Sequence, residues 1–538
     1  MSGKRCDLQM RARSRDCSAI ALALLVCGCT LGPDYVRPKI DLPVAYPAET
    51  HVHVGTGASA AGAASGAHDA HAANGVNDAG DSATVRADWW HLYADSLLDR
   101  LIERAMLNNT DLALASARIL ESEGALREAG ASLLPQVNLG AAASDSRVST
   151  AAAVPVPSFA PLIRRDYQLT ASTSYELDFW GRLRRSFESS RAQLLATEYA
   201  RDVVELTLAS TVAQTYFMLR SLDAQYAVLQ ASITSRSESL KITQQRERAG
   251  LAGALDVNQA AESLYDATVQ ARELDRQRAV ALHQLQGLTG QLDLQIEREN
   301  QPGLSLPLPA MPPAGLPSGL LERRPDVAVA EAALKSANAQ IGVAQAGQLP
   351  TFSLTAAYGG DSLSLSNILS APARLWSIGG GMTFPVLDWG RYQSRTDQAV
   401  ARQQQAVATY QKAVQGAFRD VADALSNLQQ TQNSEGDLFE RTKSARERLR
   451  LAQLRYGAGY SPYLEVLDAE RTANDADLAL VRNRQAVLVY SVDLIRAIGG
   501  GWSQSTGFSD RSPDRTPWVQ PALLAPQAPP ASAPAALG

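Results

Sequence analysis

The stretch LDFWGRLRRSFESSRA, residues 177–192, changes its hydrophobic periodicity at a Trp-Gly pair, and LDWGRYQSRTDQAVA, residues 387–401, does the same. Before the first pair, apolar and polar side chains alternate over residues 167–179, which is the period of a β-strand. After it, residues 182–247 contain neither proline nor glycine, which predicts a helix of 66 residues, about 100 Å long. A strand that passes into a very long helix twice in one chain indicates a duplicated unit.

The two copies align with two different offsets. Trp180-Gly181 maps onto Trp389-Gly390 with an offset of 209 (389 minus 180). Upstream, Leu134-Pro135 maps onto Leu349-Pro350 with an offset of 215 (349 minus 134). The first copy therefore has six more residues (215 minus 209) between the proline and the Trp-Gly pair. Each copy is predicted to run helix, strand, strand, long helix, turn, helix.

Composition divides the chain further. The first residues are basic and lead into a short apolar run, as in an export signal. A stretch of Ala, Gly, Ser and Asp cannot bury enough apolar surface to become ordered. The predicted divisions are a signal peptide at 1–28, an N-terminal segment at 29–50, a disordered linker at 51–84, a first repeat at 85–300, a Pro-rich connector at 301–317, a second repeat at 318–501 and a disordered Pro/Ala-rich tail at 502–538.

Cysteine usage points to a lipid anchor. Of the four cysteines, only Cys29 lies beyond the predicted leader, so one mature chain cannot form an internal disulfide. The small residues before Cys29 resemble a bacterial lipoprotein cleavage box, which predicts lipidation of Cys29 and attachment to a membrane surface. The alternative is an incidental cysteine at the end of an ordinary signal peptide.

Several function classes have no support in the sequence. The net charge is −5 and no long basic run is present, so nucleic-acid binding is not expected. Four of the six histidines fall in the linker at no fixed ligand spacing. We find no HExxH, P-loop, nucleophile elbow or CxxC motif, and we predict no enzyme activity, no metal site and no cofactor.

A membrane-spanning role would have to come from strands. After the leader there is no run of roughly 18 apolar residues that could form a transmembrane helix. Lipid tolerates no unpaired strand edge, so spanning strands must close into a β-barrel. Four strands per chain are too few for that, which predicts an oligomer and leaves a dimer or a trimer open. Taken alone, the alternating strands also suit a soluble, half-buried hairpin.

Four motifs resemble a known family. They are CTLGPDYVRP at 29–38, WWHLYADSLLDRLIERAMLNNTDL at 89–112, LLERRPDVAVAEAAL at 320–334 and YGAGYSPYLEVLDAER at 456–471. With these, the chain resembles the outer-membrane factors of bacterial tripartite efflux systems, the TolC-like and OprM-like channels, in their NodT-type lipoprotein branch. The resemblance implies a mainly α fold with a β-barrel portion. Each chain would supply four barrel strands and long periplasmic coiled-coil helices, and three chains would close a twelve-stranded barrel and an α-helical tunnel.

The resemblance also implies a function. The expected protein is the homotrimeric exit duct of a multidrug efflux pump, held in the outer membrane, lipid-anchored and extending into the periplasm. Its partners would be a periplasmic adaptor protein, an inner-membrane RND-type pump and outer-membrane lipid. The alternatives are the exit duct of a type I protein-secretion system and a non-conducting, lipid-anchored periplasmic scaffold.

Two groups of candidate residues lie at the ends of the predicted helices. Trp180 and Trp389 are expected near a membrane interface, where aromatic rings tolerate both phases, or as caps of the strand ends in a packed junction. Glycine in the turns after the long helices permits the left-handed conformation that ends a helix, which needs no further function. The resemblance adds that these tips form the periplasmic mouth and dock the adaptor. The tip residues are Ala249, Gly250, Leu251, Ala458, Gly459 and Tyr460.

The second turn is followed by a candidate gate. Glu465 and Asp468 are three residues apart and so share a helix face. Acidic residues are favoured in a first helical turn by the helix dipole, which is the structural alternative. The resemblance implies an acidic ring of six carboxylates in a trimer, and a latching role for Tyr456. The first copy has Asp256 and Gln259 at the positions equivalent to the acidic pair. Ser461 stands where the family's best-known member has a latching arginine.

Overall fold

The computed structural model describes residues 30–40, 43, 87–149, 151, 157, 161–299, 308–309 and 323–502. The predicted signal peptide, Cys29 and the linker lie outside the described residues, as do most of the predicted connector and tail. No helix in the described part of the chain combines the length and the hydropathy that crossing a bilayer requires.

Each copy contributes one antiparallel hairpin to a single four-stranded sheet. The strands are β1 (Gln136–Arg147), β2 (Ile163–Leu177), β3 (Thr351–Ser362) and β4 (Arg374–Thr383), in the order β1-β2-β3-β4. β2 of the first copy pairs with β3 of the second, for example Tyr175 with Leu354. The hairpins were predicted correctly, but β2 and β4 end before the predicted ends at residues 179 and 386. Beyond β2, the Phe179 ring instead packs edge-on against Phe352, with centroids 5.1 Å apart.

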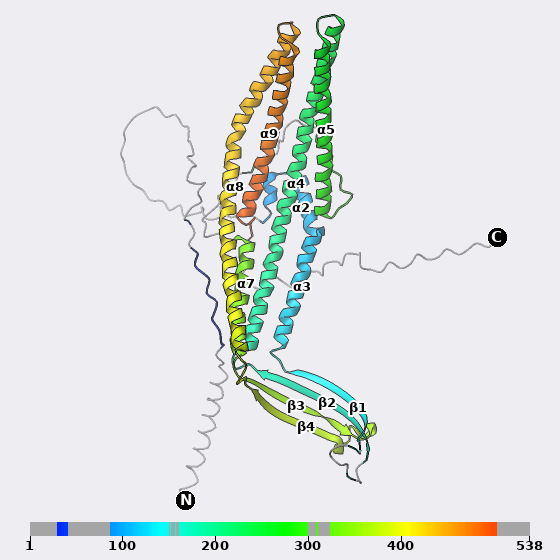
Figure 1. Ribbon diagram of the computed structural model, residues 1–538, viewed down its shortest axis with the longest axis vertical. Coiled ribbons are helices and arrows are strands. Elements are labelled where there is room, and N and C mark those ends of the chain that lie inside the picture. Colours follow the sequence, from blue (N-terminus) through cyan, green and yellow to red (C-terminus); the bar gives the residue numbers. More distant parts are fainter. Residues whose placement is uncertain are drawn as a thin grey trace, which may run out of the picture. The chain divides into compact units, whose positions relative to one another are not determined.

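Two long helical hairpins follow the strands (Figure 1). α4 (Arg182–Arg248) turns into α5 (Ala254–Thr289), and α8 (Arg391–Gly457) turns into α9 (Tyr463–Ala497). α4 and α8 have 67 residues each, so the prediction of a helix from residue 182 to 247 is confirmed to within one residue. Each begins after a glycine of positive φ, 77° at Gly181 and 82° at Gly390, where an added side chain would strain the turn.

Shorter helices precede the strands. η2 (a 3-10 helix, Trp89–Tyr93), α2 (Ser96–Asn108) and α3 (Thr110–Ala131) precede β1, and α7 (Pro325–Ala346) precedes β3. Two short 3-10 turns, η4 (Leu365–Asn367) and η5 (Ala371–Ala373), lie between β3 and β4. The Asp95 carboxylate caps α2 by accepting from the amides of Leu97 and Leu98. The Asn109 side chain caps α3 in the same way, because the first amides of a helix have no partner within it.

The main apolar core lies where η2 and α2 meet the middle of α4 and the end of α9. Trp89, Tyr93, Tyr216 and Phe217 are fully buried there, and the rings of Tyr93 and Phe217 are 5.0 Å apart. A second cluster joins α7, α8 and α9 around Tyr410. Within the chain, α4 packs on α2, α3, α5, α7 and α9, whereas α8 packs mainly on α7 and α9. One side of α8 is therefore left open in a single chain.

The N-terminal segment 30–40 is held to the helices by polar contacts. The amide of Leu31 donates to the carbonyl of Trp180 at 3.1 Å, and Asn338 donates to the carbonyl of Pro33 at 2.7 Å. Arg37 then forms a two-fold hydrogen bond with the buried carboxylate of Glu331, at 3.0 and 2.7 Å. The segment thus runs from the strand-to-helix junction along α7.

Trp502, predicted as the first residue of a disordered tail, belongs to the folded part. Its ring packs edge-on against Tyr199 at 5.6 Å, and its indole N–H donates to Asp202 at 2.9 Å. An indole brings both an apolar ring and a donor, so it binds α4 although the residues after it are rich in Pro and Ala.

Candidate functional site

The two helix tips close with the same backbone motif. In the first, the amide of Gly250 donates to Glu247 at 2.9 Å and that of Leu251 to Arg246 at 2.8 Å. In the second, the amide of Gly459 donates to Tyr456 at 3.0 Å and that of Tyr460 to Arg455 at 2.9 Å. Gly250 and Gly459 have φ of 69° and 80°, as this helix-ending motif requires. The apolar side chains that follow these glycines, Leu251 and Tyr460, are 70% and 81% exposed.

An arginine of the first hairpin holds the tip of the second. Arg246 on α4 donates to the carbonyl of Tyr456 at 3.0 Å and to that of Gly457 at 3.4 Å, both in the last turn of α8. Its guanidinium also lies 4.7 Å from the centre of the Tyr456 ring. A cation is favoured both at the negative end of a helix and over an aromatic face. Arg246 therefore links the two hairpins where they end.

Tyr456 is part of a small apolar cluster below this link. Its ring packs edge-on against Tyr463 at the start of α9, with centroids 5.4 Å apart, and both side chains are buried. The cluster also contains Ala452 of α8, Val466 and Ala469 of α9, and Ala260 of α5. Tyr456, predicted as a latch, thus contacts the other hairpin through its ring face and its carbonyl.

The acidic pair on α9 does not stand alone in the single chain. Asp468 forms a hydrogen-bonded ion pair with Arg448 of α8, and Glu465 lies 3.9 Å from the guanidinium of Arg455. All four side chains are about half exposed, so each pair contributes no more than about 1 kcal/mol. The two carboxylates and two guanidinium groups balance one another locally, which the sequence pattern did not predict.

A buried polar layer joins the hairpins farther along the helices. Glu470 on α9 is 4% exposed and accepts from the Ser239 hydroxyl of α4 at 2.9 Å. Arg236, also on α4, is buried and donates to the carbonyl of Ser263 in α5 at 2.7 Å. Among the described residues, the second oxygen of Glu470 and the side-chain oxygen of Asn474 have no hydrogen-bond partner. Burial raises the pKa of the Glu470 carboxyl, despite the Ser239 hydrogen bond and the positive charge of Arg236.

We expect Glu470→Gln to stabilise the fold at neutral pH. Because the pKa of Glu470 is higher in the folded chain, its contribution to stability is greatest below the ordinary carboxyl pKa and falls as pH rises through the raised value. Glutamine keeps an acceptor for Ser239 and carries no charge. The free energy of unfolding at pH 8 should rise by on the order of 1 kcal/mol, with little change at pH 4. Thermal unfolding followed by circular dichroism at both pH values measures this difference.

Glu331 provides the matched control, since it is a glutamate of equal burial with the opposite shift. Burial alone would raise the pKa of Glu331, but hydrogen bonds from Arg37 and the charges of Lys335 and Arg37 hold it below its usual range. Its stabilising contribution is present above the ordinary carboxyl pKa and is lost as pH falls. Glu331→Gln should therefore destabilise at pH 8. Equal effects of the two variants would contradict the assignment of Glu470 as a buried carboxylate whose burial is only partly offset by Ser239 and Arg236.

The two Trp-Gly junctions differ from one another. The Trp180 indole donates to the carbonyl of Pro350 at 2.7 Å, so this tryptophan ties the first copy to the second. Trp389 is 90% exposed and has a φ of 55°, which is strained for a bulky residue. One residue fewer separates Asp388 from Trp389 than separates Asp178 from Trp180. Trp180 therefore caps the strand ends in a packed junction, whereas Trp389 has no such packing within one chain.

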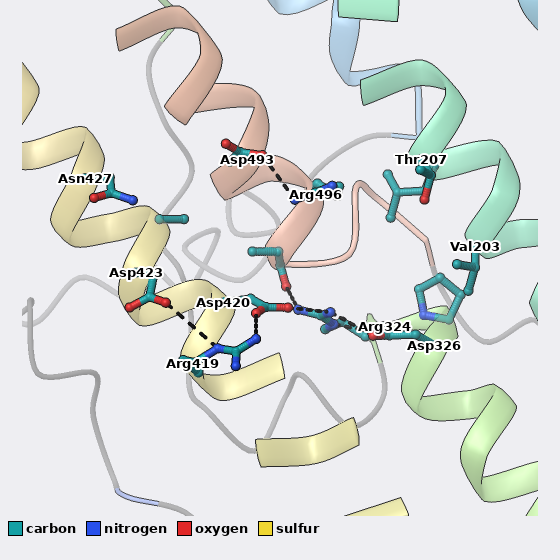
Figure 2. Close-up of a pocket in the computed structure, with 14 residues that line it drawn as sticks. Val203, Thr207, Arg324, Asp326, Arg419, Asp420, Asp423, Asn427, Asp493 and Arg496 are labelled. Atoms are coloured by element: carbon teal, nitrogen blue, oxygen red, sulfur yellow. Dashed lines mark hydrogen bonds and ion pairs between the residues drawn. The ribbon is translucent and has the colours of Figure 1, made fainter. Parts of the chain in front are cut away.

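A charged cavity of about 630 Å³ lies where α7 begins, between α4, α8 and α9 (Figure 2). Arg324 donates to Asp326 at 2.7 Å, to Asp420 at 3.2 Å and to the carbonyl of Ala497 at 3.1 Å. Figure 2 also shows Arg419 directed at Asp420 and Asp423, and Arg496 directed at Asp493. Arg324, Arg419 and Arg496 are therefore all paired with acidic residues of the same chain. These ion pairs fix the start of α7 against α8 and α9.

Within the residues that the structure describes, no group of three or more His, Cys, Asp and Glu side chains has the arrangement of a metal site. Sequence reasoning missed Arg246, Arg448, Arg455 and the buried layer around Glu470. One available signal was the offset of 209, which makes Arg246 and Arg455 equivalent residues just before the two tips.

Comparisons with known proteins agree with this architecture. The family model described as outer membrane efflux protein matches residues 101–291 and 316–500, together more than half of the chain. Outer membrane protein OprJ of Pseudomonas aeruginosa is 32% identical, over 92% of this chain and 98% of OprJ. Cation efflux system protein CusC of Escherichia coli is 31% identical, over 90% of this chain and 98% of CusC.

The solved structure of the outer-membrane channel OprN superposes with a TM-score of 0.76 at 27% identity, over 88% of this chain and all of OprN. The predicted family and fold class are thereby confirmed, with a mainly helical chain and four strands like those of solved channels of this type. The chain belongs to the outer membrane efflux protein family, whose members are trimeric outer-membrane channels that extend into the periplasm and work with an adaptor and an inner-membrane pump.

Proposed function

We propose that three copies of this chain form the passive exit duct of an efflux pump of the RND type, with its gated periplasmic mouth at the tips of the two helical hairpins. The observation that carries the proposal is the link of Arg246 to the last turn of α8, because it joins two hairpins that must separate if the mouth is to open. The duct itself performs no catalytic step. Substrate choice is left to the inner-membrane pump.

The exposed tips are the proposed docking surface for the adaptor. Leu251 and Tyr460 project exposed apolar side chains beside the positive-φ glycines, one at each tip. Exposed apolar residues in matching positions of both copies would give a trimer six equivalent contacts. The proposed tip set is Ala249, Gly250, Leu251, Ala458, Gly459 and Tyr460.

The proposed lipid anchor is Cys29. Support comes from the residues that follow it: Thr30 lies against Gly181, and Leu31 is hydrogen-bonded to the carbonyl of Trp180. Cys29 is thus next to a residue held at the junction between strands and helices. A lipid there would enter the membrane at the level of the proposed interface aromatics, Trp180 and Trp389.

The efflux role is favoured over the two alternatives. The family model that matches both copies is described as outer membrane efflux protein. CusC, which matches 90% of the chain, is named as a cation efflux system protein. This favours efflux over protein secretion. A non-conducting scaffold would give the long exposed strand β1 no partner, whereas a channel wall pairs it.

Planar-bilayer conductance of the detergent-purified trimer, with and without its adaptor, tests the proposal. Small openings are expected for the wild type alone, and larger ones when adaptor is added. Leu251→Asp/Tyr460→Asp should leave the basal openings unchanged and reduce the response to adaptor by at least tenfold. Absence of any conductance from the wild type would overturn the duct, and an unchanged adaptor response in the variant would overturn docking at the tips.

A further inference from the structure

The apolar face of the sheet ends in arginines. Directly opposed residues of an antiparallel pair share a face, as do residues two apart on one strand. Counting from Leu139 of β1 and across the strand pairs therefore places Arg147 of β1, Arg165 of β2 and Arg374 of β4 on the apolar face. All three arginines are exposed, and they lie at the strand ends away from the helices.

The charges at this end of the sheet are sorted by face. On the apolar face, Asp145 forms an ion pair of 3.2 Å with Arg165. Within the described part of the chain, no acidic side chain pairs with Arg147 or Arg374. The opposite face carries two carboxylates and one guanidinium group, on Asp166, Asp361 and Arg164. The apolar face thus has a net charge of +2 (three minus one), and the polar face has −1 (one minus two).

Aromatic residues stand next to these arginines on the same face. Toward the helices, Arg165 is followed on its face by Tyr167, and Arg374 is followed by the exposed Trp376. Trp376 is paired with Tyr358 of β3, which is also exposed. Tyrosine and tryptophan rings favour the boundary between lipid tails and headgroups. The arginines therefore lie on the headgroup side of an aromatic band.

The length of β1 gives the same depth. Arg147 is eleven residues beyond Gln136 (147 minus 136), where the strand begins beside the helices. At about 3.3 Å per residue, the two residues are about 36 Å apart along the strand. With a strand tilt of about 40°, this distance spans about 28 Å of a membrane whose apolar band is about 25 Å tall. Arg147 thus reaches the headgroups of the leaflet opposite the helices.

The loop between β3 and β4 lies against the apolar face as well. The carbonyl of Ile368 in this loop occupies the space that a Cβ of Gly360 would need, so the loop backbone packs directly on β3. Gly360 is opposite Arg374, which places the loop beside that arginine. The loop also presents three exposed leucines, Leu363, Leu365 and Leu369. Apolar side chains beside an unpaired cation match a lipid, in which tails adjoin a charged headgroup.

We propose that Arg147 and Arg374 bind the phosphate groups of lipids in the outer leaflet of the outer membrane, with the leucines of the β3–β4 loop among the lipid tails. The inference rests on the duct proposed above, in which the helices extend into the periplasm and the far strand ends face outward. A guanidinium group directs two parallel N–H donors at phosphate oxygens, which an ammonium group does not. Phosphate also neutralises the net positive charge that this face otherwise presents to lipid.

Native mass spectrometry of the full-length, detergent-purified trimer tests the proposal, with lipid A as the phosphorylated probe. Dephosphorylated lipid A with the same acyl chains is the reference lipid, and the wild type should bind it at least tenfold more weakly. Arg147→Gln/Arg374→Gln should weaken the binding of lipid A about tenfold or more, because each basic residue near an anionic lipid surface contributes to binding. The variant should bind the two lipids nearly alike.

Arg164→Gln is the matched control for Arg374→Gln, since Arg164 is an exposed arginine at the same end of the sheet but on the polar face. Arg374→Gln should weaken the binding of lipid A about fivefold, and Arg164→Gln less than twofold. Equal binding of the two lipids by the wild type, or equal losses in the two single variants, would overturn the proposal. Conductance of the same preparations separates it from the duct, because a duct that ignores lipid phosphate still conducts and a chain that forms no duct does not.

Discussion

Arg246→Ala is expected to shift the channel strongly toward its open form. The substitution removes two hydrogen bonds from a charged donor to the end of α8 and a cation held 4.7 Å from the Tyr456 ring. Such contacts contribute about 2–4 kcal/mol together in a partly buried setting. Since about 1.4 kcal/mol is a factor of ten in an equilibrium, the open fraction should rise at least tenfold. Single-channel recording in planar bilayers gives the open fraction directly.

Two further variants locate the effect. Arg248→Ala removes the same charge from an exposed position two residues away and should behave as the wild type. Tyr456→Phe keeps both the ring and the carbonyl that Arg246 contacts, so it should change the open fraction less than threefold. If Tyr456→Phe opened the channel and Arg246→Ala did not, the link would run through the tyrosine hydroxyl instead. Circular dichroism of each variant verifies that the helices remain folded.

The sequence predicted the architecture well because its signals are periodic and repeated. Alternation over residues 167–179 predicted a strand, and 66 residues without Pro or Gly predicted α4 almost to its ends. The two offsets even contained the register of β3 on β4, since a duplicated chain repeats its hydrogen bonds with its sequence. Strand ends were less predictable. The alternation continues to Phe179, but that ring turns to pack on Phe352 after the strand has ended.

The candidate site was predictable only in its local part. The helix-ending glycines, Gly250 and Gly459, follow from local backbone preference. The link of Arg246 to Tyr456 joins residues 210 positions apart, and no local pattern reports a contact of that kind. Glu470 gave no signal either, because a glutamate in a helical stretch is usually exposed and only the packing of α4 against α9 buries it.

Glu465→Gln/Asp468→Asn is expected to make the mouth selective for anions. In the single chain these carboxylates balance Arg455 and Arg448, so neutralising them leaves two unpaired guanidinium groups per chain. In a trimer the mouth would gain six positive charges, and a constriction lined by positive charge favours anions. The reversal potential in a KCl gradient should shift from its wild-type value toward the chloride equilibrium potential. The effect should shrink from 0.1 to 1 M salt, where the screening length falls from about 10 to about 3 Å.

The isosteric substitutions separate charge from width, because Gln and Asn fill nearly the same volume as Glu and Asp. Glu465→Ala/Asp468→Ala should show the same change in selectivity together with a larger conductance, since it also widens the mouth. Glu273→Ala, which opens another exposed ion pair with an arginine on α5, controls for the loss of a surface carboxylate far from the tip. A reversal potential that stays at the wild-type value in both double variants would mean that Glu465 and Asp468 face away from the ion path. Their role would then be confined to pairing α9 with α8.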